Sequence, residues 1–120
     1  MSSGPTLDVR TSTSGSVQVV HVAGDVDFAV SDQFAAAVEA ALAAATYSLV
    51  IDMSSVRFID SSAIGILIRA HKAMAARGGA FGLVAASPMI LRVISIVRLD
   101  TVFSIYPDIA SAVAAANNQG

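Results

Sequence analysis

Hydrophobic positions alternate with polar ones in the first part of the chain and form continuous runs later. Residues 6–13 and 16–23 alternate roughly, and the segment "TSGS" separates them, which predicts an antiparallel hairpin. The continuous apolar runs "YSLVIDM" at 47–53 and "AFGLVAA" at 80–86 predict central strands that are covered on both faces. A last strand is predicted at "TVFSIY", residues 101–106.

Helical patterns fill the segments between these strands. The first predicted helix is rich in alanine, and Phe34, Val38 and Leu42 at spacings of four give it an apolar stripe. Asp27 or Ser31 can cap its start, and a glycine pair ends the second helix. The predicted helices span residues 31–45, 62–77, 87–98 and 107–117.

The order of these elements indicates an α/β fold. Strands that alternate with helices favour a mostly parallel sheet with helices packed on it, and the opening hairpin adds an antiparallel strand. The sequence therefore predicts one domain, with a mixed, mostly parallel β-sheet of four to five strands and about four packed helices. The segment "SSVRF" at 54–58 is expected to link a strand to a helix. The domain is expected at residues 6–116, with flexible termini at 1–5 and 117–120.

The composition excludes several classes of protein. Of the 120 residues, 55% are hydrophobic and 13% are charged, which argues against disorder. The mean hydropathy of +0.71 raises the question of a membrane span. No run of about 18 uninterrupted apolar residues occurs, and the first residues lack the pattern of a signal peptide. We therefore expect no membrane insertion and a cytoplasmic location.

Charge and cysteine content exclude further kinds of site. The formal net charge is -2 and the basic residues are spread singly, so nucleic-acid binding has little electrostatic support. The chain has no cysteine, which excludes disulfides, thiol catalysis and thiolate metal sites. Dinucleotide-binding and P-loop motifs are also missing from the sequence. We expect no metal and no cofactor.

The segment "RFIDSSAIG" brings one acid and two hydroxyls to the predicted start of the second helix. Either Asp60 or Ser61 is expected to cap that helix. A helical wheel puts Ser62 opposite the apolar arc that should face the sheet, with Ile66 and Arg69 beside it. An exposed isoleucine next to an exposed serine indicates a partner surface. The arc itself consists of Ile64, Leu67, Ile68, Met74 and Ala75.

Two interpretations of the hydroxyls compete. In the first, they only help to cap the helix. In the second, Ser62 is phosphorylated, which adds about -1.5 to -2 charges at neutral pH. A helix N-terminus favours anions, so the fold is expected to survive the phosphate. A partner docked at that spot would instead meet a new charge.

The segment "LVIDMSSVRFIDSSAIGILI" resembles the central part of STAS domains, specifically of bacterial anti-sigma factor antagonists, which are also called anti-anti-sigma factors. The segment "VAGDVDFAVSDQF" is similar to the turn before the first helix of that family. The segment "SPMILRVISIVRLDTVFSIYPDIASAVAA" is similar to its closing half. The resemblance covers roughly residues 6–116.

This resemblance implies a transcription regulator that is not an enzyme. Such antagonists bind an anti-sigma factor, often a serine kinase of the histidine-kinase-like ATPase fold, and thereby release a sigma factor. The kinase phosphorylates one serine, which ends binding, and a PP2C-type phosphatase restores it. The acceptor falls on Ser62, with Ser61 as the alternative. The expected partner-binding residues are Asp25, Asp27, Asp60, Ser61, Ser62, Ile66 and Arg69. A monomer or weak dimer is expected.

Two positions depart from the family pattern. Ala63 stands where many members carry glycine, and Val30 stands where threonine or serine is common. Alanine is the better helix former, so the fold should not suffer, although the approach of a kinase to Ser62 could narrow.

Two other functions are alternatives to the antagonist. A hydrolase triad of Ser62 and His71 is disfavoured, because the two residues project from opposite sides of one helix. A STAS scaffold subunit of a lipid- or anion-transport complex, not phosphorylated, is the alternative function. The two readings differ in whether the Ser62 hydroxyl is needed.

Overall fold

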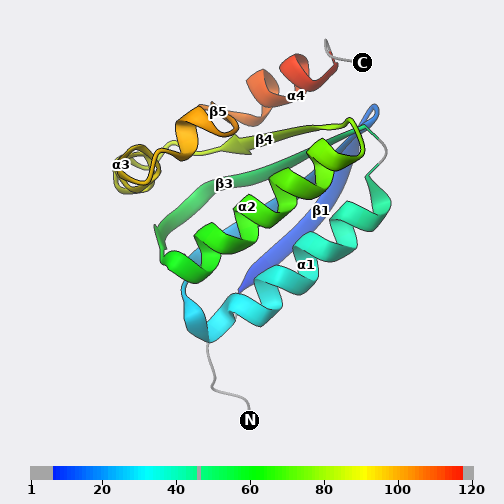
Figure 1. The fold of residues 1–120 in the computed structure, drawn as a ribbon. Helices are drawn as coiled ribbons and strands as arrows, with labels where there is room; N and C mark the ends of the chain where they lie inside the picture. Colours follow the sequence, from blue (N-terminus) through cyan, green and yellow to red (C-terminus); the bar gives the residue numbers. More distant parts are fainter. Residues whose placement is uncertain (1–6, 46, 118–120) are drawn as a thin grey trace.

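Within residues 7–45 and 47–117, which the computed structural model describes, five strands form one mixed sheet (Figure 1). Their order across the sheet is the same as their order in the chain. The first two strands are an antiparallel hairpin, and the other three run parallel to the second. The strands are β1 (Asp8–Ser14), β2 (Val17–Val26), β3 (Ser48–Ile59), β4 (Ala80–Val84) and β5 (Ser104–Tyr106).

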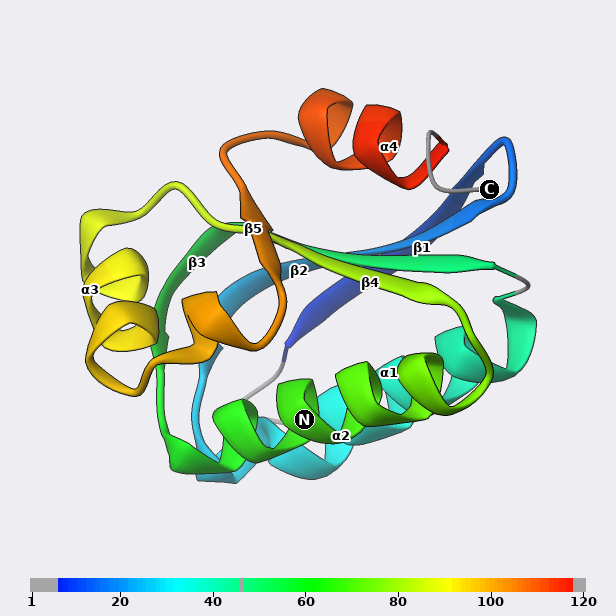
Figure 2. The same cartoon turned by 45° about the horizontal axis from the view of Figure 1, so that its top comes forward.

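Helices cover both faces of this sheet unequally. Figure 2 shows α1 and α2 side by side below the sheet and the shorter α4 above it, with α3 at one end. In the described part of the chain, the helices are α1 (Ser31–Ala44), α2 (Ser61–Ala76), α3 (Pro88–Ile96) and α4 (Ile109–Asn117). Two short 3-10 turns, η1 (Phe28–Val30) and η2 (Leu99–Thr101), complete the chain trace. None of the helices among the described residues is long and apolar enough to cross a bilayer.

β3 is longer than the sequence predicts. Residues 54–58, expected to be a link, continue the strand, because the buried side chains of Val56 and Ile59 keep it packed on the core. From the pair His21–Asp52 to the pair Asp25–Phe58, β3 advances six residues while β2 advances four. Such bulges bend a strand and re-aim its side chains. The bulges take up the extra residues of β3, so β2 and β3 end together at one edge of the sheet.

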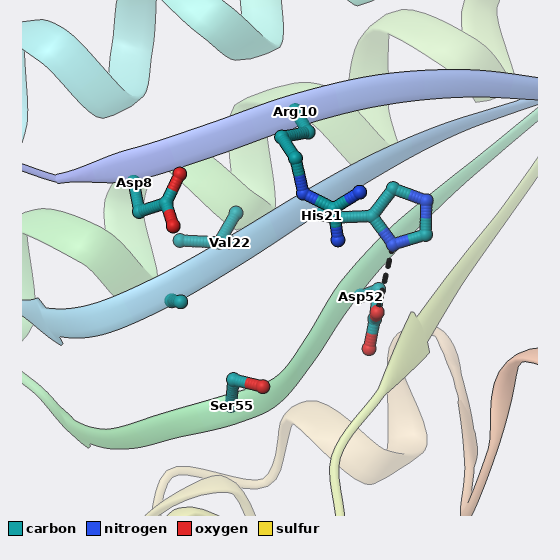
Figure 3. A pocket seen from close by; sticks show the side chains of 7 residues that line it. Asp8, Arg10, His21, Val22, Asp52 and Ser55 are labelled. Carbon is teal, nitrogen blue, oxygen red and sulfur yellow. Dashed lines mark hydrogen bonds and ion pairs between the residues drawn. The ribbon is translucent and has the colours of Figure 1, made fainter.

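The face under α4 is only partly covered. Strand alternation places His21 on the same face as Val17 and Val19, which pack against α4, and pairing places Asp52 next to His21. Beyond α4 this face carries polar side chains instead of apolar ones. They surround a small cavity of about 60 Å³ (Figure 3). It is lined by Asp8, Arg10, His21, Val22, Ala23, Asp52 and Ser55.

The predicted fold class is confirmed, with small differences at the ends of elements. The strand predicted at 80–86 ends at Val84, and the strand predicted at 101–106 is reduced to Ser104–Tyr106 because η2 precedes it. Asn117, expected in a flexible terminus, is the last residue of α4. The other residues expected to be flexible, 1–5 and 118–120, lie outside the described residues.

Candidate functional site

The start of α2 is organised by the carboxylate of Asp60. Its backbone is extended, and Oδ1 accepts hydrogen bonds from the amides of Ser62 (3.0 Å) and Ala63 (3.3 Å). Asp60 is therefore the N-cap, which decides between the two residues that the sequence left open. Ser61, the other possibility, is the exposed first residue of the helix.

Asp60 also binds the side chain of Ser62. The Ser62 hydroxyl donates to Asp60 Oδ1 at an oxygen–oxygen distance of 2.5 Å. This hydrogen bond lowers the pKa of Asp60 below its ordinary value; burial opposes the shift, and the amides of Ala63 and Ser62 add to it. The carboxylate is therefore ionised at neutral pH, and the hydroxyl proton of Ser62 points at it.

The ends of β2 and β3 bring two more acids to this point. Asp60 N donates to the carbonyl of Val26 at 3.3 Å, which ties the start of α2 to the end of β2. Asp27 follows directly and caps η1 by accepting from Ala29 N at 3.0 Å. Asp25 is exposed on β2, opposite Phe58 of β3. The three predicted acids, Asp25, Asp27 and Asp60, thus share one edge of the sheet.

The cap of α1 differs from both residues that the sequence proposed. Asp27 caps the preceding 3-10 turn, and the hydroxyl of Ser31 donates to the carbonyl of Phe28 at 2.9 Å instead of accepting from the helix. Val30 occupies the N-cap position of α1 without a side-chain hydrogen bond. The turn η1 therefore takes over the role of a cap and projects Phe28 outward.

An open groove of about 250 Å³ runs between α1 and α2 beside Ser62. Ser62 is half-buried along it, and Arg69 is exposed two turns further along α2. A side chain at Gly65 would begin 3.7 Å from Nη1 of Arg69, so the guanidinium lies back over Gly65 toward Ser62. The groove is lined by Ser31, Asp32, Ala35, Ser61, Ser62, Gly65, Ile66 and Arg69.

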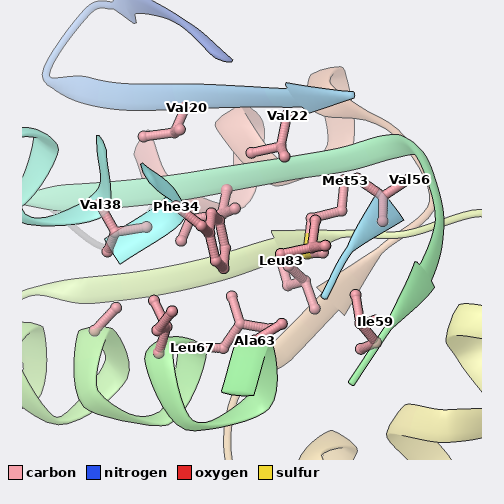
Figure 4. Close-up of a cluster of buried hydrophobic side chains, with 14 of the residues drawn as sticks. Val20, Val22, Phe34, Val38, Met53, Val56, Ile59, Ala63, Leu67 and Leu83 are labelled. Carbon is pink, nitrogen blue, oxygen red and sulfur yellow. The ribbon is translucent and has the colours of Figure 1, made fainter. Parts of the chain in front are cut away.

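The prediction that Ile66 is exposed is wrong. Ile66 is only 5% exposed and belongs to the main hydrophobic core. The wheel assumed that only the sheet buries α2, whereas α1 lies alongside it and covers the flank that carries Ile66. Figure 4 shows Ala63 and Leu67 on the side of α2 that faces the buried cluster. The buried residues of α2 are Ala63, Ile66, Leu67, Ala70 and Met74. Of the predicted apolar arc, Ile64 and Ile68 are only half-buried and Ala75 is exposed.

Two exposed aromatic side chains at this site are not among the residues predicted from the sequence. Phe28, in η1, is 79% exposed, and Phe58, near the end of β3, is 43% exposed. Their sequence signal is an aromatic residue next to the acids, in "DVDF" and "RFID". These two phenylalanines, and not Ile66, are the large apolar side chains exposed beside the acids.

His71 is not part of this site. Its ring packs against Phe81 and Phe103, with centroid distances of 6.0 and 5.6 Å, and its Nδ1 is buried without a hydrogen-bond partner among the described residues. The Ser62 hydroxyl binds Asp60 instead. The described residues also contain no group of three or more His, Asp or Glu side chains that could hold a metal ion.

Comparison with known proteins places this geometry in a family. The family model of the STAS domain matches residues 8–112. The chain belongs to the STAS domain family. Proteins of this family that act as anti-sigma antagonists are generally not enzymes. The described fold agrees with the family, since solved STAS structures superpose on it over nearly the whole chain.

Several relatives of this STAS domain carry a more specific name. The crystal structure of an anti-sigma factor antagonist from Mycobacterium paratuberculosis is 30% identical with a TM-score of 0.87, covering 93% of this chain and 95% of that one. An anti-sigma-factor antagonist (STAS) domain protein from Planctomyces limnophilus is 25% identical with a TM-score of 0.84, covering 91% and 97%. A curated Thermotoga neapolitana protein, named "Putative anti-sigma factor antagonist TM1081 homolog", is 37% identical over 60 residues. That match covers 50% of this chain, which thus spans about half (53%) of the curated relative.

Proposed function

We propose that this STAS domain is an anti-sigma factor antagonist whose binding is ended by phosphorylation of Ser62. It binds an anti-sigma factor and thereby releases a sigma factor for transcription. The observation that carries the proposal is the hydrogen bond from the Ser62 hydroxyl to the ionised Asp60 at the N-terminus of α2. The names of the relatives at 30% and 37% identity support it.

The proposed partner surface surrounds the start of α2. Its apolar part is formed by Phe28 and Phe58, because both are exposed and adjoin the acids. Ile66 supports this surface from the core and does not contact the partner. Aromatic side chains commonly carry much of the energy of such interfaces. The polar part consists of Asp25, Asp27, Asp60, Ser61, Ser62 and Arg69.

Ser62 is the better of the two phosphate acceptors. Its hydroxyl proton already points at a carboxylate, which orients Oγ for attack on a phosphoryl group. Ser61 is more exposed but follows the cap directly and lacks this orientation in the hydrogen bonds of the described residues. We therefore keep Ser61 as the alternative acceptor.

Phosphorylation would change the surface without unfolding the domain. The free amides at the start of α2 favour an anion, whereas Asp60 repels one. A phosphate on Ser62 is therefore directed away from Asp60 and into the groove, where Arg69 lies. A docked anti-sigma factor would have to desolvate that charge, which weakens binding.

The remaining features of the proposal follow from this role. The partner is an anti-sigma factor of the histidine-kinase-like ATPase fold, which also acts as the kinase, and a PP2C-type phosphatase removes the phosphate. The domain works in the cytoplasm as a monomer or weak dimer. Antagonism requires only binding, so it needs no cofactor and no reaction catalysed by this chain.

Mass spectrometry tests the proposal. The protein is incubated with ATP and each anti-sigma kinase from the same genome, and the modified peptide is sequenced. A single phosphate on Ser62, absent from Ser62→Ala, is the expected result. Stable binding without any phosphate contradicts the switch but not the antagonist. The absence of both favours a scaffold subunit of a transport complex and overturns the proposal.

A further inference from the structure

Three neighbouring strands align a serine, a histidine and an aspartate on the open face of the sheet. The Ser12 hydroxyl of β1 lies 2.9 Å from Nε2 of His21 on β2. Nδ1 of the same ring lies 2.9 Å from Oδ2 of Asp52 on β3. These contacts join residues from three strands, and the sequence gives only one hint of them: one polar residue inside each of the apolar runs "QVVHVA" and "LVIDMS".

The hydrogen bonds of Asp52 determine where the imidazole proton lies. Ser54 donates its amide (3.0 Å) and its hydroxyl (2.7 Å) to Oδ1, which leaves Oδ2 for His21. Burial raises the pKa of Asp52, but the hydrogen bonds from Ser54 and His21 outweigh it and leave the pKa below its ordinary value. An ionised carboxylate only accepts hydrogen bonds, so Nδ1 of His21 must carry a proton. In the neutral ring, the lone pair of Nε2 then faces the Ser12 hydroxyl.

Part of this row borders a small cavity, although Ser12 itself does not line it. The cavity of about 60 Å³ adjoins His21 and Asp52, and Arg10 lies directly opposite His21 in the β1–β2 pairing (Figure 3). The guanidinium of Arg10 makes no hydrogen bond or ion pair with another described residue, so its donors are free to bind an anionic oxygen. Ser12 itself is exposed on the edge strand.

We propose that Ser12 is a nucleophile that takes an acyl group from small activated esters, with His21 as its general base and Asp52 as a positioning residue. Ser12 Oγ forms a bond to the carbonyl carbon while its proton passes to His21 Nε2. The bond from that carbon to the leaving oxygen then breaks, and the leaving alcohol takes up the proton. The products are an acyl-serine and an alcohol. Water can then hydrolyse the acyl-serine, with His21 taking the proton from water and returning it to Ser12 Oγ. Arg10, paired with His21 on the neighbouring strand, is the cation offered to the developing oxyanion in this proposal.

This site is separate from the proposed partner surface. Ser62 lies on α2, whereas Ser12, His21 and Asp52 lie on the sheet face that α1 and α2 do not cover. The proposal therefore does not depend on antagonism, and either can fail alone.

The first test is the tautomer of His21, read from nitrogen chemical shifts and two-bond nitrogen–proton couplings at neutral pH. A proton on Nδ1 and a free Nε2 are expected. A proton on Nε2, or on both nitrogens, overturns the proposal, because no base then faces Ser12. In Asp52→Asn the amide can donate to Nδ1, so the proton is expected to move to Nε2.

The second test is acetylation by p-nitrophenyl acetate, followed by peptide mass spectrometry. Ser12 is expected to be acetylated in the wild type, and His21→Gln is expected to lower the rate at that residue by about 100-fold or more. Ser12→Ala should lose the label. Ser14→Ala is the matched control, because Ser14 is exposed on the same strand outside the row, and it should behave as the wild type.

Two results of the acetylation test would overturn the proposal that Ser12 is a nucleophile. An equal rate at Ser12 in the wild type and His21→Gln overturns the proposal, as does labelling spread evenly over exposed serines. Because Asp52 is buried, Asp52→Asn can fail to fold. The decision then rests on the more exposed His21 and Ser12, whose variants are checked for a normal melting curve.

Discussion

One oxygen of Asp60 both caps α2 and holds the hydroxyl of Ser62, at an Oδ1–Oγ distance of 2.5 Å. The residue that stabilises the helix is thus also the residue that orients the proposed phosphate acceptor. This shared role means that stability and regulation can be separated only by choosing substitutions with care.

Asp60→Ala should destabilise the domain by about 1 kcal/mol, because the amides of Ser62 and Ala63 lose their acceptor. Ser61→Ala should change the free energy of unfolding by less than about 0.5 kcal/mol, since Ser61 is exposed and does not cap. Urea unfolding of both variants measures the difference. Equal losses in the two variants would reject Asp60 as the cap.

Acid should weaken the fold through Asp60. The folded state lowers the pKa of this carboxyl below its ordinary 3.8, so the unfolded chain binds the proton more tightly. The contribution is therefore fully present above the ordinary pKa and is lost as the pH falls through the lower, folded-state pKa. Melting temperatures from about pH 5 to about pH 2 should fall less steeply in Asp60→Asn, which still caps the helix but does not titrate. If the melting temperatures of the wild type and Asp60→Asn fall equally with pH, the lowered pKa of Asp60 is contradicted.

Ile66 should act through stability and not through contact with a partner. Ile66→Ala should cost about 2–4 kcal/mol, because the side chain is 5% exposed within the main core. The control is Ile96→Ala on α3, where the side chain is 72% exposed and the change should stay within about 0.5 kcal/mol. Chemical denaturation compares the two. An Ile66→Ala variant as stable as the wild type would contradict the burial of Ile66 and favour the exposed position predicted from the sequence.

Phe28 should act through contact with a partner and not through stability. Phe28→Ala should leave the melting temperature nearly unchanged, because the ring is 79% exposed, and weaken binding of the anti-sigma factor by about tenfold. Ile96→Ala is again the control, since it removes a similarly exposed apolar side chain at α3. Titration calorimetry with the anti-sigma factor gives both affinities. Unchanged binding by Phe28→Ala would exclude the aromatic part of the proposed surface.

Gly65 is expected to keep the groove beside Ser62 open to a kinase at a cost in helix stability. An added Cβ would make only an ordinary contact, 3.7 Å from Arg69 Nη1, and alanine in a helix interior is more stable than glycine by about 0.5–1 kcal/mol. Gly65→Ala should therefore raise the melting temperature and slow phosphorylation of Ser62, because the methyl group narrows the groove. A kinase assay at equal protein concentration measures the second effect. Faster or unchanged phosphorylation would contradict it.

Local sequence patterns were sufficient for the fold class and for the place of Ser62. Alternating and continuous apolar runs predicted the strands, and the acid before two hydroxyls marked the start of α2. The missed cap of α1 has a local cause, the turn η1, whereas the other main errors come from contact between segments far apart in the chain. Ile66 is buried by α1, residues 54–58 remain in β3 through bulged pairing with β2, and the pair His21–Asp52 depends on strand register.

The central claim is tested most directly by measuring the affinity of the anti-sigma factor for three proteins: the wild type, Ser62→Ala and Ser62→Glu. Ser62→Ala should bind within about threefold of the wild type, and Ser62→Glu should bind at least about tenfold more weakly, which is about 1.4 kcal/mol. Ser111→Glu is the matched control, because Ser111 lies in the first turn of α4 under a similar aspartate hydrogen bond (Ser111 N to Asp108 Oδ1, 2.7 Å) on a distant surface. Its affinity should equal that of the wild type. Equal binding by all of these proteins would contradict the switch at Ser62.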